Sequence, residues 1–251
     1  MTPQDPSPFT SQRLHYRSIR PTEDLPVFHA INNDPSGYCN SNFSNAKLPT
    51  SSDAESFLKQ TAEDSLVGAI IWLPHDPFLS SEQIVEIVEN GRQNSEIMDT
   101  KLGTAIGEIH LSSLPKHCTH HRHTEIGLDI LPAYQRQGFG SEAILWAADY
   151  AFRRLGMHRV RIRAFGYNEG AVRLYEKLGF VNEGSERECI WFDGRWWDGI
   201  MFGLLEGEWE ALRKKKKKKQ KQELVVKDGG EERKTAKLEQ TELGEGLRES
   251  R

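Results

Sequence analysis

The chain has 251 residues, enough for one domain of ordinary size with shorter appendages. Residues 1–212 carry 19 Lys and Arg against 29 Asp and Glu, whereas residues 213–251 carry 14 against 8, so an acidic body precedes a basic tail. An acidic body repels nucleic acid, which excludes a specific nucleic-acid-binding protein. No apolar run is long enough to cross a bilayer, which excludes a membrane protein. The three scattered cysteines imply no disulfide framework, which excludes a disulfide-rich secreted protein.

Composition divides the chain into three parts. Residues 1–11 are rich in proline and polar, without the apolar segment of a signal peptide, and we expect a flexible N-terminus. Residues 12–209 hold the globular domain. Residues 210–251 are rich in Lys and Glu and almost free of aromatics, which predicts a disordered tail. We expect a cytoplasmic protein. The lysine run at 214–219 is a nuclear localisation signal, a signal for an anionic surface, or merely a solvated tail.

The first elements are a strand and two helices. Residues 13–20 alternate in polarity, which is typical of a strand. A helix follows to about Asn32, with Thr22 as its predicted N-cap and the segment 33–35 as its stop signal. The cluster Ser-Ser-Asp at 51–53 predicts a second helix, which extends to about residue 63.

Three strands and an insertion come next. The apolar run 66–73 predicts a buried strand, and residues 103–111 and 124–131 have strand character as well. The segment 74–102 between the first two of these strands is too long for an ordinary loop, and we interpret it as an insertion with a short structured piece at 84–88.

The second half alternates helices and strands. Residues 141–155 have the apolar stripe of an amphipathic helix, residues 159–165 alternate as a half-buried strand does, and residues 168–178 form a second amphipathic pattern that ends at Gly179. The dipeptide Asp193-Gly194 separates two strand-like runs and predicts a two-residue hairpin turn. The flanking runs are residues 186–192 and 195–205.

This order, β-α-α-β-β-β-α-β-α-β-β, predicts a mixed α/β (α+β) fold. We expect a largely antiparallel central sheet flanked by helices, with one strand–helix–strand crossover in its second half.

A glycine-rich loop, Gln135 to Ser141, joins a predicted strand to the strongest predicted helix. Glycines at such a turn let backbone N–H groups approach a phosphate, and the positive end of the helix dipole points to the same place. A glycine-rich helix entry without a ligand remains the alternative. Gly140 is followed by Ser141-Glu142-Ala143, which lacks the Lys of a P-loop and the third Gly of a dinucleotide fingerprint.

Three ordered motifs resemble those of the GCN5-related N-acetyltransferases (the GNAT family). The loop Gln-Arg-Gln-Gly-Phe-Gly at 135–140 is similar to the family's Gln/Arg-x-x-Gly-x-Gly/Ala loop. Residues 125–130 resemble the strand before it, and residues 168–180 resemble its Asn-x-x-Ala-x-x-Leu-Tyr-x-x-x-Gly-Phe signature. The Asp193-Gly194 turn with Trp197-Asp198 resembles the branch that includes ribosomal-protein alanine and spermidine N-acetyltransferases. The insertion at 74–102 departs from compact members.

The resemblance implies an acetyl-CoA-dependent N-acetyltransferase that acts through a ternary complex, by direct attack of a primary amine on the thioester. It assigns the cofactor to the strand edge, the loop and the following signature. These residues are Leu128, Asp129, Ile130, Gln135, Arg136, Gln137, Gly138, Phe139, Gly140, Ser141, Asn168, Ala171 and Tyr175.

The resemblance also implies an acid and leaves the base open. Tyr175 is the expected general acid for the leaving thiolate, although helix periodicity alone favours core packing for this residue. Glu125 and Glu108, on central strands, are the alternative bases, and each is otherwise an ordinary exposed carboxylate. The acceptor is a protein N-terminus, a polyamine or a small-molecule amine, and the protein is expected to be a monomer or a homodimer.

Two further alternatives follow from the same residues. The His- and Cys-rich loop 117–123 crowds its potential ligands together without a distant second pair, so we expect no metal site. The functional alternative is a non-catalytic acyl-CoA-binding regulator with the same fold. A nucleotide-binding module is a third hypothesis, which the missing lysine and glycine disfavour.

Overall fold

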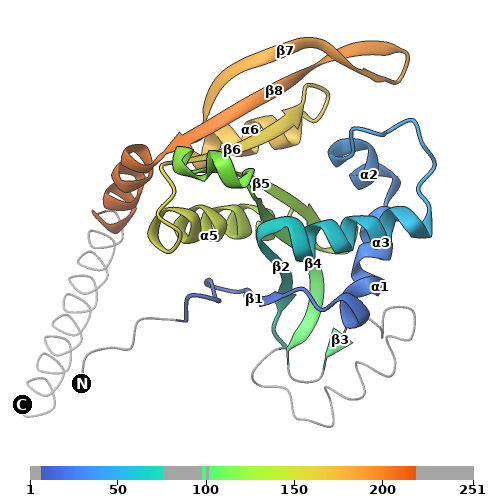
Figure 1. The fold of residues 1–251 in the computed structure, drawn as a ribbon, viewed down its shortest axis with the longest axis horizontal. Coiled ribbons are helices and arrows are strands. Elements are labelled where there is room, and N and C mark those ends of the chain that lie inside the picture. Colours follow the sequence, from blue (N-terminus) through green and yellow to red (C-terminus); the bar gives the residue numbers. More distant parts are fainter. Residues whose placement is uncertain (1–6, 76–97, 100–101, 219–251) are drawn as a thin grey trace, which may run out of the picture. The chain divides into compact units, whose positions relative to one another are not determined.

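The computed structural model describes residues 7–75, 98–99 and 102–218 (Figure 1). The chain forms two compact units, Met1–Glu206 and Gly207–Arg251. The predicted short element at 84–88 and the tail beyond residue 218 lie outside the described residues.

The first unit is built on a mixed sheet with the strand order β1-β2-β4-β5-β6-β8-β7, with β3 beside β4. Only β5 and β6 are parallel; every other pair of neighbouring described strands is antiparallel. The predicted fold class and crossover are therefore confirmed. The strands are β1 His15–Ser18, β2 Ser65–Leu73, β3 Met98–Asp99, β4 Gly103–Ser112, β5 His123–Ile130, β6 Arg159–Phe165, β7 Val181–Phe192 and β8 Arg195–Leu205.

Helices cover two faces of this sheet. They are α1 Pro21–Asn32, α2 Pro35–Ser41, α3 Ser51–Lys59, α5 Phe139–Arg153 and α6 Glu169–Leu178. A π-helical turn, η1 Gln60–Asp64, extends α3, and the short turns η3 Lys116–His121 and η4 Pro132–Tyr134 precede and follow β5. In Figure 1, α5 lies on one side of β2, β4 and β5, and α1 and α3 lie on the other.

Two details near α1 differ from the sequence prediction. Thr22 is not the N-cap: Arg20 takes that position and the helix starts at Pro21, whose missing N–H suits a first turn. The Asp24 carboxylate accepts a hydrogen bond from Arg20 N (2.6 Å). The stop signal at Asp34-Pro35 also begins the unpredicted helix α2, because the Asp34 side chain accepts from Ser36 N.

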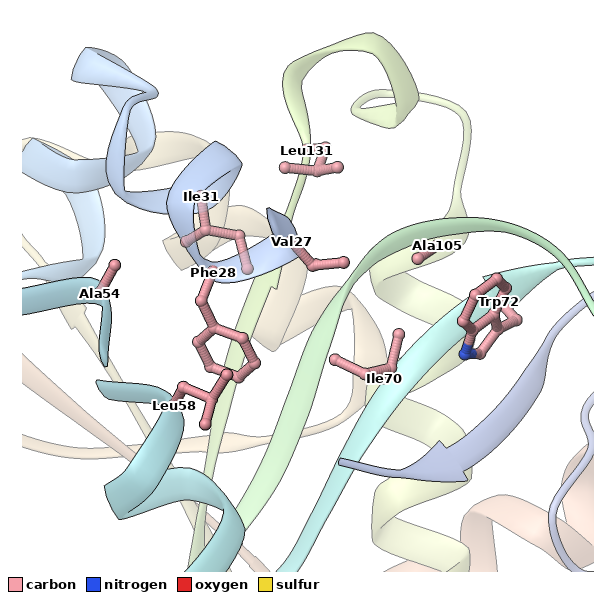
Figure 2. Close-up of a cluster of buried hydrophobic side chains, with 9 residues drawn as sticks. All are labelled: Val27, Phe28, Ile31, Ala54, Leu58, Ile70, Trp72, Ala105 and Leu131. Carbon is pink, nitrogen blue, oxygen red and sulfur yellow. The ribbon is translucent and has the colours of Figure 1, made fainter. Parts of the chain in front are cut away.

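The α1–α3 face of the sheet carries an apolar cluster (Figure 2). Phe28 is fully buried and packs edge-on against Phe57 of α3. The cluster joins α1 and α3 to β2, β4 and the end of β5. Its members are Val27, Phe28, Ile31, Ala54, Leu58, Ile70, Trp72, Ala105 and Leu131.

The hairpin was predicted correctly. Asp193 and Gly194 both have positive φ, 51° and 76°, as a two-residue turn between twisted strands requires. Strand β7 begins at Val181, earlier than the predicted residue 186, because it pairs with β8 along almost its whole length.

In the second unit, residues 207–218 are helical. The tail predicted to be disordered from residue 210 therefore differs over 210–218, where Lys, Arg, Ala and Leu favour a helix and Lys214 faces Glu210 at 3.6 Å. No helix among the described residues has the length and apolarity to span a bilayer.

Candidate functional site

Strand β5 changes its partner along its length. Residues His123, Thr124 and Glu125 pair with β6, whereas residues 126–130 pair only with β4. The strands β5 and β6 therefore diverge after Glu125, and one edge of the second half of β5 has no neighbouring strand among the described residues.

The backbone groups of Leu128 and Ile130 point to this open edge. Leu131 N donates to Ile106 O of β4 (2.8 Å), and Glu125 N donates to Ser112 Oγ at the end of β4 (3.0 Å). Because successive residues of a strand alternate, the even-numbered residues present their N–H and C=O groups to the other side. The Ile130 carbonyl accepts from Gln135 Nε2 (2.8 Å), and the other groups of this edge are able to pair with an extended, amide-containing ligand.

Asp129 is oriented differently from its two neighbours. If Gly107 of β4 carried a β-carbon, this atom would lie 2.1 Å from the Asp129 carbonyl oxygen. The backbone of Asp129 therefore faces β4 rather than the open edge. Its side chain lies on the same face as Leu131, a member of the α1–α3 cluster. Asp129 was predicted to bind the cofactor through the strand edge, and its position instead favours a role of its side chain on the α1–α3 face.

The glycine-rich loop lies at the end of the open edge. Helix α5 begins at Phe139, earlier than predicted, with Gly138 as its left-handed N-cap (φ 85°). Glu142 N donates to Gly138 O, so the first-turn amides of Phe139, Gly140 and Ser141 precede the first intrahelical bond. A β-carbon at Gly140 would lie 3.6 Å from Leu128 Cδ2, which places these amides beside β5. The free amides of this helix N-terminus lie next to a strand edge, in an arrangement that can bind an anion.

Residues Ser11 and Arg13 of the N-terminal segment hold this loop in place. The sequence patterns did not indicate this contact. Arg13 Nη1 donates to Gln137 O (3.1 Å), and its guanidinium lies over the Phe139 ring at 4.5 Å. Arg13 N and Nε both donate to Glu142, and Ser11 Oγ donates to the same carboxylate (2.7 Å). Partial burial opposes ionisation of Glu142, but these hydrogen bonds outweigh it and hold its pKa below the ordinary value.

Helix α6 supplies the remaining predicted residues. The Asn168 side chain caps this helix by accepting a hydrogen bond from Ala171 N (3.1 Å), which fixes the first turn of α6. Tyr175 lies two turns further along, with its ring edge-on to Phe202 (5.7 Å). Burial raises the pKa of Tyr175, and the negative charge of Asp129 raises it further, so the phenol keeps its proton.

The two candidate bases have different surroundings. Glu125 accepts a hydrogen bond from Arg163 Nε (2.6 Å) and lies 3.6 Å from Arg161 Nη2, so two guanidinium groups of β6 stabilise its charge. Glu108 is completely buried on β4, where its Oε2 contacts His110 Nδ1 at 3.0 Å. Among the described residues, Oε1 of Glu108 has no hydrogen-bond partner.

Asp129 stands opposite Glu108 in the β4–β5 pair. Burial raises the pKa of Asp129 to about 7, and the Glu108 charge adds to this effect. The folded pKa thus exceeds the unfolded value of about 3.9, so this carboxyl opposes folding once it ionises. The cost is absent below about pH 4, grows as pH rises and levels off above about pH 7.

We therefore expect Asp129→Asn to stabilise the fold at pH 8, because the amide keeps the shape and removes the charge that faces Glu108. Thermal unfolding of both proteins at pH 8 and pH 4 measures this. The gain should shrink at pH 4, where the carboxyl is protonated in the folded protein and the cost of ionising it has almost vanished. A lower melting temperature for the variant at pH 8 would contradict the assigned environment.

The His- and Cys-rich loop lies on η3 and the start of β5. Among the described residues, no group of three or more His, Cys, Asp or Glu side chains is arranged to hold a metal ion.

A sequence profile described as an acetyltransferase (GNAT) domain matches residues 13–181. The spermidine N(1)-acetyltransferase of Vibrio cholerae is 35% identical over 89 residues, which cover 36% of this chain and 51% of that protein. The uncharacterized N-acetyltransferase YoaA of Bacillus subtilis is 35% identical over 115 residues, 46% of this chain and 62% of that protein. The chain spans about half the length of the curated relatives that it matches.

Solved structures share the fold. An acetyltransferase of the GNAT family from Bacillus anthracis aligns with a TM-score of 0.58 at 21% identity, covering 79% of this chain and 98% of that one. The spermidine N-acetyltransferase of Vibrio cholerae in complex with CoA and spermine aligns with a TM-score of 0.59 at 23% identity, covering 78% and 98%.

Proposed function

Since the chain belongs to the GNAT acetyltransferase family, we propose that it transfers the acetyl group of acetyl-CoA to a primary amine. The observation that carries this proposal is the open edge of β5 beside the first-turn amides of α5. An extended pantetheine arm fits an unpaired strand edge, and a pyrophosphate fits a helix N-terminus. Both features lie side by side, as a single ligand with both groups requires.

The cofactor contacts follow from this arrangement. Leu128 pairs with the pantetheine amides through its N–H and C=O groups and Ile130 through its N–H, because the Ile130 carbonyl already accepts from Gln135 Nε2 (2.8 Å). The N–H of Leu128 is also available to polarise the thioester carbonyl. The amides of Phe139, Gly140 and Ser141 bind the pyrophosphate, with Gln135, Arg136, Gln137 and Gly138 shaping the loop. Asn168 and Ala171 set the start of α6 and thereby the position of Tyr175.

The reaction proceeds in a ternary complex by direct attack of the amine. Tyr175 donates its proton to the departing sulfur, because a phenol whose pKa is raised stays neutral at physiological pH. Between the two candidate bases, the surroundings favour Glu108, because Glu125 is held by Arg161 and Arg163.

The acceptor side of the site is acidic. Glu108 and Asp129 face the α1–α3 side, and Asp34 adds its charge near Asp129. Such a field attracts a cationic amine, and we propose a polyamine or another small-molecule amine ahead of a protein N-terminus. The relationship to spermidine N(1)-acetyltransferases supports this choice. We keep a monomer or a homodimer as the proposed assembly, although one structural neighbour is described as dodecameric.

Calorimetric titration with acetyl-CoA and, separately, with ATP tests the cofactor assignment. We expect binding of acetyl-CoA and none of ATP, because the loop lacks the lysine of a P-loop. Binding of ATP without acetyl-CoA would favour a nucleotide-binding module. The non-catalytic regulator differs from the enzyme only in turnover, so a measurement of thiol release with a panel of amines distinguishes the two.

We expect Arg13→Ala to weaken acetyl-CoA binding about tenfold, since a charge-assisted contact to the loop contributes about 1–2 kcal/mol. The guanidinium fixes Gln137 and Glu142 at the phosphate end of the site. Calorimetry gives the dissociation constant. The matched control is Arg153→Ala at the far end of α5, where the arginine pairs with the half-buried Asp149 (3.2 Å). A lower melting temperature with an unchanged dissociation constant would contradict the role of Arg13 at the loop.

A further inference from the structure

We propose that His110 takes the proton from the acceptor amine through its Nε2 atom, and that the buried Glu108 is a positioning residue that holds the imidazole. This inference rests on the proposed acetyltransferase function and replaces a lone carboxylate with a Glu–His pair as the base. The sequence patterns did not single out His110.

The first reason is the contrast in burial between the two partners. Glu108 has no exposed surface, whereas the His110 side chain is 23% exposed. A fully buried carboxylate has no direct path to a solvated amine. The contact between Glu108 Oε2 and His110 Nδ1 at 3.0 Å favours the proton on Nδ1, which leaves the Nε2 lone pair free to accept.

The second reason is that the imidazole occupies a defined space over Gly127. A β-carbon at Gly127 of β5 would lie 2.1 Å from His110 Cε1 and 2.3 Å from Nε2, so the ring occupies the space that any side chain there would fill. Phe57 of α3 packs edge-on against the ring at 6.1 Å. The position of the ring therefore depends on glycine at residue 127.

The third reason is that the space over Gly127 lies next to the open edge of β5, where the cofactor is proposed to bind. Gly127 directly precedes Leu128, whose backbone N–H faces the open edge. The side chains of Leu128 and Ile130 lie toward Gly140 of α5, so the alternation of β5 places Gly127 and His110 on the α1–α3 face. Ile70, which pairs with Glu108, belongs to the apolar cluster of that face. Cofactor and base thus approach the same strand from opposite sides.

The charges around His110 suit a base. Burial lowers the pKa of His110, but the charge and hydrogen bond of Glu108, with the charges of Asp129 and Glu125, outweigh it, and the pKa lies above the ordinary value. The group from α3 that packs on the ring, Phe57, is neutral. A base of this strength removes a proton from an ammonium group more readily than an ordinary carboxylate does.

The proton balance is complete. An acceptor that enters as an ammonium ion gives its first proton to His110 Nε2, which returns it to water through the exposed part of the ring. The amine nitrogen then forms a bond to the carbonyl carbon, and the carbon–sulfur bond breaks. The second proton, released from nitrogen as the adduct collapses, replaces the proton that Tyr175 gives to sulfur.

His110→Gln tests the proposal in the full chain. We expect turnover to fall about 100-fold or more, as for the loss of a general base, while the dissociation constant of acetyl-CoA changes little. The inflection that His110 gives to the acidic limb of the pH profile of kcat/KM should disappear, and activity should instead follow the deprotonation of the amine itself. Gly127→Ala keeps His110 but places a β-carbon in the space that its ring occupies, and it should also lower turnover. The control His117→Gln, on the exposed turn η3, should leave turnover and profile unchanged.

A titration by nuclear magnetic resonance keeps the test independent of activity. The pKa of His110 in the wild-type protein should exceed its value in Glu108→Gln, because the substitution removes the charge at Nδ1. Equal values in the two proteins would overturn the pair. Full turnover and an unchanged acidic limb in His110→Gln would overturn the base. If the wild-type protein binds acetyl-CoA and shows the titration shift but acetylates no amine, the proposed function fails and the Glu–His pair stands.

Discussion

Replacing Gly140 by glutamate should weaken acetyl-CoA binding by at least about 100-fold. Gly140 is the second residue of α5, and a β-carbon there would contact Leu128 and Ile130 at 3.6 and 3.8 Å without a clash. A carboxylate at this position extends over the strand edge and lies beside the phosphates. Two like charges about 4 Å apart repel by about 4 kcal/mol at an effective dielectric constant of about 20, and the steric block adds to this.

The same substitution should leave the fold intact, which separates a binding defect from unfolding. An acidic residue in the first turn stabilises a helix through its dipole. Gly140→Ala is the matched control for size and should bind acetyl-CoA nearly as the wild type does. Gly207→Glu controls for added charge, since a β-carbon at Gly207 meets no atom within 4 Å. Calorimetric binding by Gly140→Glu close to the wild-type value would contradict the assignment of the loop.

Gly138→Glu should weaken binding as well, for a different reason. Gly138 has φ 85°, a left-handed conformation that costs other residues about 1–2 kcal/mol, and it positions the first amides of α5. Its effect therefore combines backbone strain with charge, which makes Gly140 the clearer test.

The second large effect is expected for Tyr175→Phe. Turnover should fall about 100-fold, within the range of general acid catalysis, whereas the dissociation constant of acetyl-CoA should change less than about threefold. The ring keeps its packing against Phe202, so only the hydroxyl is lost. Steady-state kinetics combined with calorimetry separates the two quantities.

Tyr150→Phe on α5 is the control for the loss of a phenol elsewhere in the same domain, next to Trp146 and Phe9. Because burial and Asp129 raise the pKa of Tyr175, its ionisation should not shape the pH profile near neutrality. Equal turnover of Tyr175→Phe and the wild type would remove the acid role and return this residue to core packing.

Local patterns in the sequence predicted most of the elements. The alternation over residues 159–165 matches β6 at both ends, and Asp193-Gly194 forms the expected turn. These features depend on residues close in the chain, so a sequence displays them directly. Helix α2 was missed because a proline after Asp34 marks either the end of one helix or the start of another, and here it does both.

The site depends on contacts between distant residues, which sequence patterns do not display. Glu108 and Glu125 look alike as acids on central strands, and only the parallel pairing of β5 with β6 brings Arg161 and Arg163 to Glu125. The role of Arg13 depends on Glu142, which is 129 residues away in the chain. His110 occupies its place because Gly127, across the β4–β5 pair, has no side chain.

Acetyl transfer to an amine is the central claim, and a panel of amines tests it most directly. The full-length protein is mixed with acetyl-CoA and, in turn, polyamines, aminoglycoside-like amines, small metabolite amines and peptides with free N-termini. Release of CoA thiol and the product mass are measured together. We predict thiol release matched by an acetylated product for at least one cationic amine, and a fall of about 100-fold in both rates in Tyr175→Phe. Tight binding of acetyl-CoA with neither thiol release nor product across the panel would contradict the account and favour a non-catalytic acyl-CoA-binding regulator.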